Sequence, residues 1–271
     1  MTESTIRNKN KYAVSEFFNG RSNYRQSELH AKMAERFLRL AAPKLGERVL
    51  DIATGTGFVS IPTARIVGEA GAVVGIDISP GMLEQAAEDL EAAGLKNLKL
   101  VEADAESLDY PNESFDLITC CNALPYMSNV PLALHRWHKF LRPGGRLVFN
   151  CWAEDSHATG KLLRDVAAHH RIVVPVVGWD TGSPDRCRTV LMDAGYSSVE
   201  VIVEPTKNYW PATKLFEIFE VALRNPLFGI MPDDLDRVGS LRDEYANYAH
   251  STGVLTSVET EIGAYFVIAS R

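Results

Sequence analysis

The stretch Val49-Leu50-Asp51-Ile52-Ala53-Thr54-Gly55-Thr56-Gly57 decides the fold of this chain. Apolar residues lead to an acidic residue and then to a run of small ones, which is typical of a buried parallel strand that turns sharply into a helix. Gly55 and Gly57 carry no side chain, so the backbone can approach a ligand closely. We expect the helix to begin at about Thr56 and to aim its unpaired N–H groups at the same place. The stretch therefore predicts a ligand site, although a tight turn that binds nothing has the same pattern.

The composition is that of an ordinary globular protein, with 46% hydrophobic and 23% charged residues among 271. This length allows one large domain or two small ones, and we expect one domain with insertions. No apolar run is as long as a membrane span, and Met1-Thr2-Glu3-Ser4 has neither the basic region nor the apolar core of an export signal. We therefore expect a cytoplasmic protein that makes no use of a membrane.

The formal net charge of −7 gives no general attraction for a phosphate backbone, and no basic stripe with interleaved aromatic residues opposes it. Nucleic acid is therefore not an expected partner. The four cysteines, at positions 120, 121, 151 and 187, show no zinc-ligand spacing. We interpret them as buried thiols, and we expect no metal site.

Strand and helix patterns alternate along most of the chain, which predicts a parallel sheet with helices on both faces. The expected strands are Val49–Ile52, Ala72–Asp77, Leu98–Val101, Phe115–Cys121, Arg146–Cys151, Val199–Val203 and Gly263–Ala269. About fifty residues between the last two strands carry two helical patterns instead. We interpret residues 205–259 as a helical cap near the ligand-binding edge, with a peripheral pair of packing helices as the alternative. Residues 1–27 would form an N-terminal cap segment, and 28–204 with 260–271 would form the core.

Four segments, in the right order and spacing, resemble the class I S-adenosylmethionine-dependent methyltransferases. They are Val49 to Gly57, Val74 to Leu83, Glu102 to Ala105 with Phe115 to Leu124, and Leu141 to Val148. The chain is most similar to the small-molecule branch that includes the ubiquinone and menaquinone C-methyltransferases. The resemblance covers residues 28–152 well and the rest in outline. It implies a seven-stranded, mostly parallel, doubly wound α/β sheet in the order 3-2-1-4-5-7-6, with the last strand antiparallel.

This resemblance implies a cofactor, S-adenosyl-L-methionine, at the ends of the first and fourth strands, where the winding of the sheet reverses. Asp51 would attract the ammonium group, and Asp77 would accept hydrogen bonds from both ribose hydroxyls. Asp104 would accept from the adenine amino group. The remaining cofactor residues that the resemblance implies are Tyr24, Ala53, Gly55, Gly57, Ile78, Met82, Ala105, Cys121 and Asn122. Ala53 departs from the glycine of many relatives but is small enough to preserve binding.

The acceptor pocket is expected to be lined by aromatic side chains near the same mouth, which suits a flat, apolar metabolite. These residues are Tyr12, Phe18, Tyr126, Trp152, Trp210 and Phe219. Each of them could equally belong to the ordinary core. A general base is optional in methyl transfer, and His157, which follows the fifth strand, is the first candidate; Glu154 and Asp155 come second. A solvent-facing role for His157 is the alternative.

A dinucleotide-binding dehydrogenase is the main competing interpretation, because it also has a glycine turn followed by an acidic residue about twenty positions later. Here Gly57 is followed three positions later by Ser60 instead of glycine or alanine. We therefore expect a methyltransferase that acts by in-line displacement on a small apolar or aromatic metabolite, such as one of a secondary-metabolite pathway. A quinone-pathway C-methyltransferase is one alternative, and a protein of the same fold that binds the cofactor without transferring methyl is another. The sequence does not determine the number of subunits.

Overall fold

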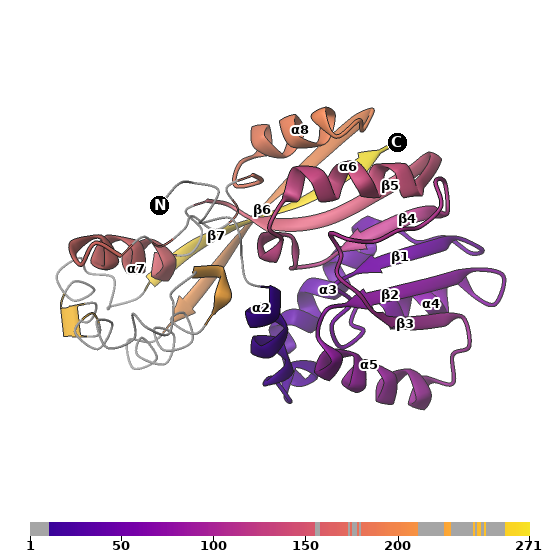
Figure 1. Ribbon diagram of the computed structural model, residues 1–271, viewed down its shortest axis with the longest axis horizontal. Coiled ribbons are helices and arrows are strands. Elements are labelled where there is room, and N and C mark those ends of the chain that lie inside the picture. Colours follow the sequence, from indigo (N-terminus) through magenta and orange to yellow (C-terminus); the bar gives the residue numbers. More distant parts are fainter. Residues whose placement is uncertain are drawn as a thin grey trace.

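The computed structural model describes residues 11–154, 158–172, 174, 178, 180–210, 225–228, 241, 243, 244, 247 and 258–271. Within these residues the chain forms one seven-stranded sheet flanked by helices (Figure 1). In the described part, no helix has the length and apolar character needed to cross a membrane.

The strands follow the order β3-β2-β1-β4-β5-β7-β6, which confirms the predicted topology. The first five strands pair in parallel, and β7 is antiparallel to both of its neighbours. The strands are β1 (Arg48–Ile52), β2 (Ala72–Asp77), β3 (Leu98–Glu102), β4 (Phe115–Cys120), β5 (Leu141–Trp152), β6 (Ser198–Trp210) and β7 (Val258–Ser270).

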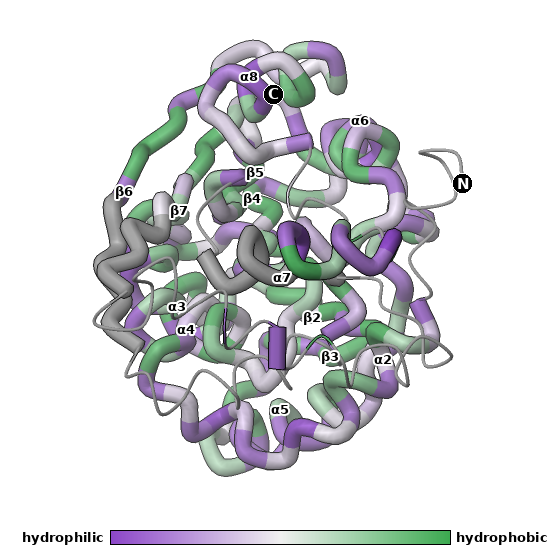
Figure 2. Tube along the Cα trace, turned by 90° about the vertical axis from the view of Figure 1, so that its left-hand side faces the viewer, coloured by the Kyte–Doolittle hydropathy of each residue, from purple (hydrophilic) through white to green (hydrophobic). Residues whose placement is uncertain are grey.

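Helices cover both faces of the sheet, as a doubly wound fold requires. One core cluster joins the sheet to α6 and α8, and a second cluster joins the opposite face to α3, α4 and α5. Figure 2 shows α5 in mixed purple and green, as expected for a helix with one face on the core. The described helices are α2 (Lys11–Asn19), α3 (Glu28–Ala41), α4 (Ser60–Val67), α5 (Pro80–Ala93), α6 (Val130–Phe140), α7 (Ala158–His169) and α8 (Pro184–Asp193), with short 3₁₀ turns η1 (Tyr24–Gln26), η2 (Leu124–Tyr126) and η4 (Pro226–Phe228).

The two central strands, β1 and β4, lie side by side and are buried almost throughout. Their register sets Asp51 opposite Thr119 near the carboxyl ends of both strands. From β1 the chain moves outward through β2 to β3, and from β4 it moves the other way, so the winding reverses between them. The crevice at this reversal is where open α/β sheets bind ligands.

The helix after β1 begins later than the sequence predicted. α4 starts at Ser60 instead of about Thr56, because Gly55 and Gly57 adopt φ of +56° and +87°, outside the right-handed helical region. The Gly57 N–H donates to the Thr54 carbonyl at 3.0 Å and closes a tight turn. The expected row of free helical N–H groups is therefore replaced by a turn.

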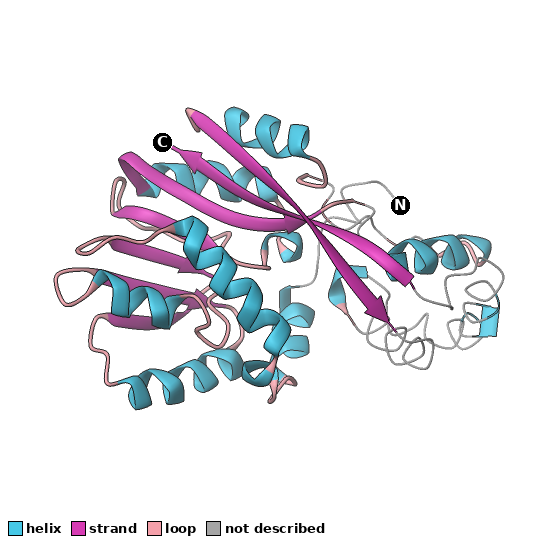
Figure 3. Cartoon of the chain, turned by 180° about the vertical axis from the view of Figure 1, so that it is seen from behind, coloured by secondary structure: helices cyan, strands magenta, loops and turns pink. Residues whose placement is uncertain are grey.

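The last two strands are longer than predicted, since β6 continues to Trp210 and β7 begins at Val258. Their extensions pair with each other from Glu204–Ala264 out to Trp210–Val258. Figure 3 shows this antiparallel ribbon reaching beyond the rest of the sheet. Residues 205–210 and 258–259, expected in the helical cap, are thus strand.

Candidate functional site

A cavity opens at the carboxyl ends of β1, β2, β3 and β4 and encloses about 780 Å³ of space, counting its open mouth. Its lining comprises Lys11, Val14, Phe18, Tyr24, Ala53, Gly55, Ile76, Asp77, Ile78, Met82, Ala103, Asp104, Ala105, Glu106, Cys121, Asn122, Ala123, Tyr126 and Met127. A side pocket shares several of these lining residues and is lined also by His30 and Asp51.

The turn after β1 uses backbone conformations that bring main chain to the cavity. Ala53 and Gly55 both line it, and both have positive φ, 53° and 56°. A Cβ on Gly55 would meet no atom within 4 Å, so the turn leaves open space there. Gly57 differs from the expectation, because it does not line the cavity; a Cβ there would lie 2.7 Å from Cδ1 of Ile61. Both this crowding and the φ of +87° favour glycine at position 57.

Asp77 ends β2 with its carboxylate held by the backbone. Oδ2 accepts from the Gly55 N–H at 2.8 Å, and Oδ1 accepts from the Ser79 N–H at 2.9 Å. Burial raises the pKa of Asp77, and these backbone hydrogen bonds oppose that rise. Each oxygen retains a further lone pair, so the carboxylate is oriented and still able to accept from a ligand hydroxyl.

Asp51 carries a buried carboxylate oxygen that has no hydrogen-bond partner. Oδ1 accepts from the Thr119 hydroxyl at 2.6 Å, while Oδ2 is fully buried and unpartnered. Burial raises the pKa of Asp51 to about 6, and the nearby Thr119 and Thr54 hydroxyls and Ser60 backbone oppose that rise only in part. An orphaned carboxylate oxygen is costly in a folded protein, so this atom calls for a cationic or hydrogen-bond-donating ligand.

Asn122, the second residue after β4, is held in place by the side-chain amide of Asn150. Asn122 has φ of +58°, and its N–H donates to Oδ1 of Asn150 on β5 at 2.7 Å. In return, Nδ2 of Asn150 donates to Oδ1 of Asn122 at 2.5 Å. A ligand ammonium needs acceptors, and the backbone acceptors at this position are the carbonyl groups of Cys121 and Asn122.

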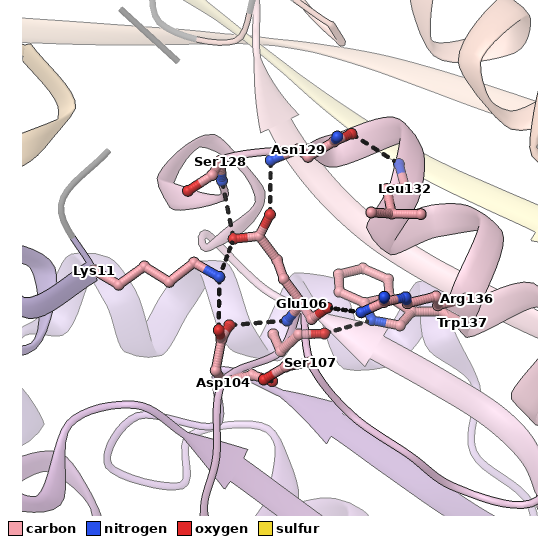
Figure 4. Close-up of polar contacts among 10 residues, drawn as sticks. Lys11, Asp104, Glu106, Ser107, Ser128, Asn129, Leu132, Arg136 and Trp137 are labelled. Atoms are coloured by element: carbon pink, nitrogen blue, oxygen red, sulfur yellow. Dashed lines mark hydrogen bonds and ion pairs between the residues drawn. The ribbon is translucent and has the colours of Figure 1, made fainter. Parts of the chain in front are cut away.

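Ion pairs join α2 to the loop after β3, where Asp104 and Glu106 line the cavity (Figure 4). Lys11 Nζ lies 2.6 Å from Oδ2 of Asp104 and 3.0 Å from Oε2 of Glu106. Burial tends to lower the pKa of Lys11, but the hydrogen bonds to both carboxylates outweigh it and raise this pKa. Glu106 also accepts from the N–H groups of Ser128 and Asn129, so it joins α2 to the loop after η2.

The mouth of the cavity is a cluster of aromatic rings. Phe18 and Tyr126 stack edge to face with centroids 5.2 Å apart, and Tyr24 lies 4.5 Å from the ring of His30. Burial raises the pKa of Tyr24 and of Tyr126, so both phenols remain protonated. Burial lowers the pKa of His30 to about 4, which keeps its imidazole neutral at pH 7.

Of the six predicted acceptor residues, Phe18 and Tyr126 line this cavity, and Tyr12 and Trp152 do not. Tyr12 is 72% exposed on the outer side of α2, and Trp152 packs against the core cluster that contains Phe37. Trp210 ends β6, and its side chain lies outside the described residues. Phe219 and the candidate base His157 also lie outside the described residues, as does Asp155. The second candidate base, Glu154, pairs with Arg186 at 2.7 Å.

Several lining residues were missed from the sequence. Lys11 and Glu106 come from segments that carry no motif, and their pairing joins positions far apart in the chain. His30 sits within a helical pattern that gave no reason to single it out. Asn225 donates to the Tyr126 hydroxyl at 3.4 Å, although its sequence signal, Asn-Pro, indicated only a helix break.

Comparison with known proteins assigns a family to this geometry. A methyltransferase-domain model matches residues 49–145, which hold the turn after β1, Asp77 and the β4 tip. UbiE from Escherichia coli O1:K1 / APEC, a ubiquinone/menaquinone biosynthesis C-methyltransferase, is 31% identical over 172 residues, 57% of this chain and 68% of UbiE. The chain belongs to the class I S-adenosylmethionine-dependent methyltransferases.

This methyltransferase has further relatives in sequence and in structure. The aklanonic acid methyltransferase DauC from Streptomyces sp. strain C5 is 39% identical over 122 residues, 45% of this chain and only 56% of DauC. In fold, a SAM-dependent methyltransferase from Aquifex aeolicus matches with a TM-score of 0.53 at 16% identity, covering 93% of this chain and 97% of that one. The structural likeness covers 93% of this chain, whereas the family model spans only residues 49–145.

The residues present fit S-adenosyl-L-methionine, the methyl donor of the methyltransferase. The orphaned Asp51 oxygen matches an ammonium group, and the oriented Asp77 carboxylate matches a pair of hydroxyls. Apolar side chains of Ile78 and Met82 line the same cavity and offer a surface for a base. Opposite chemical groups of one ligand therefore have partners in the main cavity and in the side pocket that shares part of its lining.

Proposed function

We propose that the methyltransferase moves a methyl group from S-adenosyl-L-methionine to a small apolar or aromatic metabolite by in-line displacement. The observation that carries this proposal is the composition of the cavity. Carboxylates and turn backbone line one part, and Phe18, Tyr126 and Met127 line another. A donor and a flat acceptor can therefore meet inside one enclosed space.

In this proposal the cofactor residues divide into three groups. Asp51 and the carbonyl groups of Cys121 and Asn122 hold the ammonium end, with Tyr24 covering it. Asp77 holds the ribose, with Ala53 and Gly55 supplying the close backbone approach. The adenine lies among the remaining lining residues Ile78, Met82, Asp104 and Ala105.

The sulfonium of the bound cofactor supplies an activated methyl group, so the protein mainly aligns the acceptor and excludes water. Alignment by itself can contribute several kcal/mol, up to about 7–11 kcal/mol in well-oriented systems. The aromatic mouth formed by Phe18, Tyr24 and Tyr126 suits both tasks, because rigid rings hold a flat acceptor and leave little room for solvent.

A general base is needed only when the acceptor atom must lose a proton before attack. The buried phenols of Tyr24 and Tyr126 are poor bases, since burial raises their pKa. We keep His157 as the proposed base for an acceptor hydroxyl. Residues 205–259 remain our proposed substrate cap, supported by the Asn225–Tyr126 hydrogen bond and the contacts of η4 with α2 and η2.

The acceptor class follows from the cavity and from the relatives. DauC is named for aklanonic acid and UbiE for ubiquinone and menaquinone biosynthesis. We therefore place the chain in a biosynthetic pathway for such a small molecule, and a quinone-pathway C-methyltransferase is the second candidate that the likeness to UbiE favours. The net charge of −7 supports our proposal that nucleic acid is not the acceptor.

Mass spectrometry of reactions with labelled cofactor tests this function. The protein is incubated with S-adenosyl-L-methionine carrying a trideuterated methyl and with panels of aromatic polyketides, quinols and simple phenols. Transfer to a panel compound, giving a gain of one labelled methyl, is the expected result. Transfer confined to DNA, RNA or protein acceptors would refute the proposal, and transfer to a quinol carbon would select the second candidate.

A further inference from the structure

Arg21 is a half-buried cation beside aromatic residues of the cavity, and no anionic partner for it lies among the residues that the structure describes. It lies in the turn between α2 and η1, and its guanidinium sits 4.9 Å from the ring centroid of Tyr24 and 5.7 Å from that of Phe17. Its backbone carbonyl accepts from Gln85. Within the described part of the chain, however, no carboxylate or carbonyl accepts a hydrogen bond from the guanidinium.

Other half-buried arginines of the described structure are satisfied differently. Arg36 pairs with Glu204, Arg146 pairs with Glu47 at 2.8 Å, and Arg136 donates to the Glu106 carbonyl. The exposed neighbour Arg25 also pairs, with Glu88 at 2.7 Å. In a chain with an excess of seven negative charges, an arginine left without an acceptor beside a ligand cavity stands out.

The ring contacts fix the position of the guanidinium but do not use its donors. A guanidinium offers five N–H groups in a planar fork, and an aromatic face engages only its charge. The fork matches a carboxylate or another planar oxyanion bidentately. Arg21 is not itself a lining residue, but its guanidinium lies against Tyr24, which lines both the main cavity and the side pocket.

The positive charge of Arg21 also affects the pKa values of residues that line the cavity and the side pocket. Burial raises the pKa of Tyr24 and Tyr126, and the positive charge of Arg21 opposes the rise at both. Burial lowers the pKa of His30, and Arg21 lowers it further. The acidic residues Asp51, Asp77 and Asp104 lie instead at or just after the ends of strands. Each of them accepts a hydrogen bond from a neighbouring group.

We propose that Arg21 is the anion-binding residue of this pocket and binds the carboxylate, or a similar planar oxyanion, of a bound small molecule. This inference rests on the proposed function. Two sources can deliver that group: an acidic methyl acceptor, or the amino-acid end of the cofactor. In the first case Arg21 selects for acidic aromatic acceptors over neutral ones.

Calorimetric titration with matched ligands distinguishes the two sources. The cofactor arm compares S-adenosylhomocysteine with 5′-methylthioadenosine, which has the same nucleoside thioether but no amino-acid end. The acceptor arm, run with S-adenosylhomocysteine present, compares 2-naphthoate with 2-naphthamide. Both arms use the wild-type chain, Arg21→Gln, and Arg25→Gln as a matched control, because Arg25 is a neighbouring arginine that is already paired with Glu88 and Asp89.

Arg21→Gln is expected to weaken the carboxylate ligand of one arm by about 10-fold or more, which is the scale of a lost charge-assisted hydrogen bond, and to leave its neutral partner within about 2-fold. Loss with 2-naphthoate identifies the acceptor as the source, and loss with S-adenosylhomocysteine identifies the cofactor. Equal losses for charged and neutral ligands, or no loss in either arm, would overturn the role of Arg21. Failure of the wild-type chain to bind S-adenosylhomocysteine would instead overturn the proposed function. Circular dichroism of each variant verifies folding.

Discussion

Substitution of Asp51 by asparagine should stabilise the free protein and weaken cofactor binding. The carboxylate is fully buried with Oδ2 unpartnered, and burial raises its pKa from the ordinary 3.8 to about 6. Because the folded chain holds this proton more tightly than the unfolded chain, stability falls as the pH rises from 3.8 to about 6. An ionised Asp51 therefore destabilises the empty protein at neutral pH.

The size of the effect follows from this shift in pKa. A change of about 2 units corresponds to roughly 3 kcal/mol at pH 7.5, of which about 1 kcal/mol is already lost at pH 4.5. Asp51→Asn keeps an acceptor for the Thr119 hydroxyl and removes the titration. The stability of the variant relative to the wild type should thus rise by about 2 kcal/mol between pH 4.5 and pH 7.5, measured by urea denaturation without cofactor.

Binding should respond in the opposite direction. Removal of a charged partner of the ammonium group costs about 1.5–3 kcal/mol, or roughly 10- to 150-fold in the Kd for S-adenosylhomocysteine at pH 7. For the wild type, Asp51 must lose its proton to bind, so the Kd should rise about 10-fold from pH 7 to pH 5. The variant should show no such rise.

Asp116→Asn is the matched control, because Asp116 is also buried but its carboxylate is paired with Arg142 and accepts from the Arg48 N–H at 2.6 Å. This variant should lose stability and retain the wild-type Kd. The reasoning about Asp51 is refuted if Asp51→Asn destabilises the free protein at pH 7.5, or if it binds S-adenosylhomocysteine as tightly as the wild type.

Three further predictions concern other parts of the site. Asp77→Ala should weaken S-adenosylhomocysteine binding by roughly 10- to 150-fold in calorimetry, because charge-assisted hydrogen bonds to the ribose are lost; an unchanged Kd would contradict this placement. Lys11→Met should speed dissociation of S-adenosylhomocysteine by about 5-fold in stopped-flow fluorescence, since α2 loses its ion pairs to the loop after β3, whereas Lys32→Met, at an exposed pair on α3, should not. His157→Ala should lower kcat by about 100-fold or more for a hydroxyl acceptor without changing the Kd of S-adenosylhomocysteine, and equal activity would remove it as the base.

The central architecture was predictable because local patterns and topology agree. The run from Val49 to Gly57 and the alternation of strands and helices both specify a parallel sheet, and the family resemblance supplied the strand order. Asp51 and Asp77 could be placed because they end strands, and strand ends of a parallel sheet share one edge. The cavity indeed draws ten of the twelve predicted cofactor residues into its main lining.

What could not be predicted depends on contacts between segments remote in sequence. Lys11 reaches Asp104 across 93 positions, and no local pattern encodes such a pair. Tyr12 was expected in the pocket, but Val14 is the buried residue of α2, so the helix turns Tyr12 to its exposed side. Gly57 has the signature of a ligand-binding glycine, yet the side chain of Ile61 occupies the space beside it.

The extension of β6 beyond Val203 was also invisible in the sequence. The residues that follow, Glu204-Pro205-Thr206-Lys207-Asn208, are mostly polar and include a proline, which argues against a strand. Pairing with the antiparallel partner β7 nevertheless continues to Trp210. Because β6 is the edge strand, only one of its sides must form ladder hydrogen bonds, and a proline is tolerated there.

A crystal structure of the chain with S-adenosylhomocysteine tests the central claim most directly. The account predicts the ribose hydroxyls within hydrogen-bond distance of the Asp77 carboxylate and the ammonium group within about 3 Å of the Asp51 oxygen that now lacks a partner. A ligand bound outside this cavity, or one whose ammonium group leaves Asp51 unpaired, would contradict it.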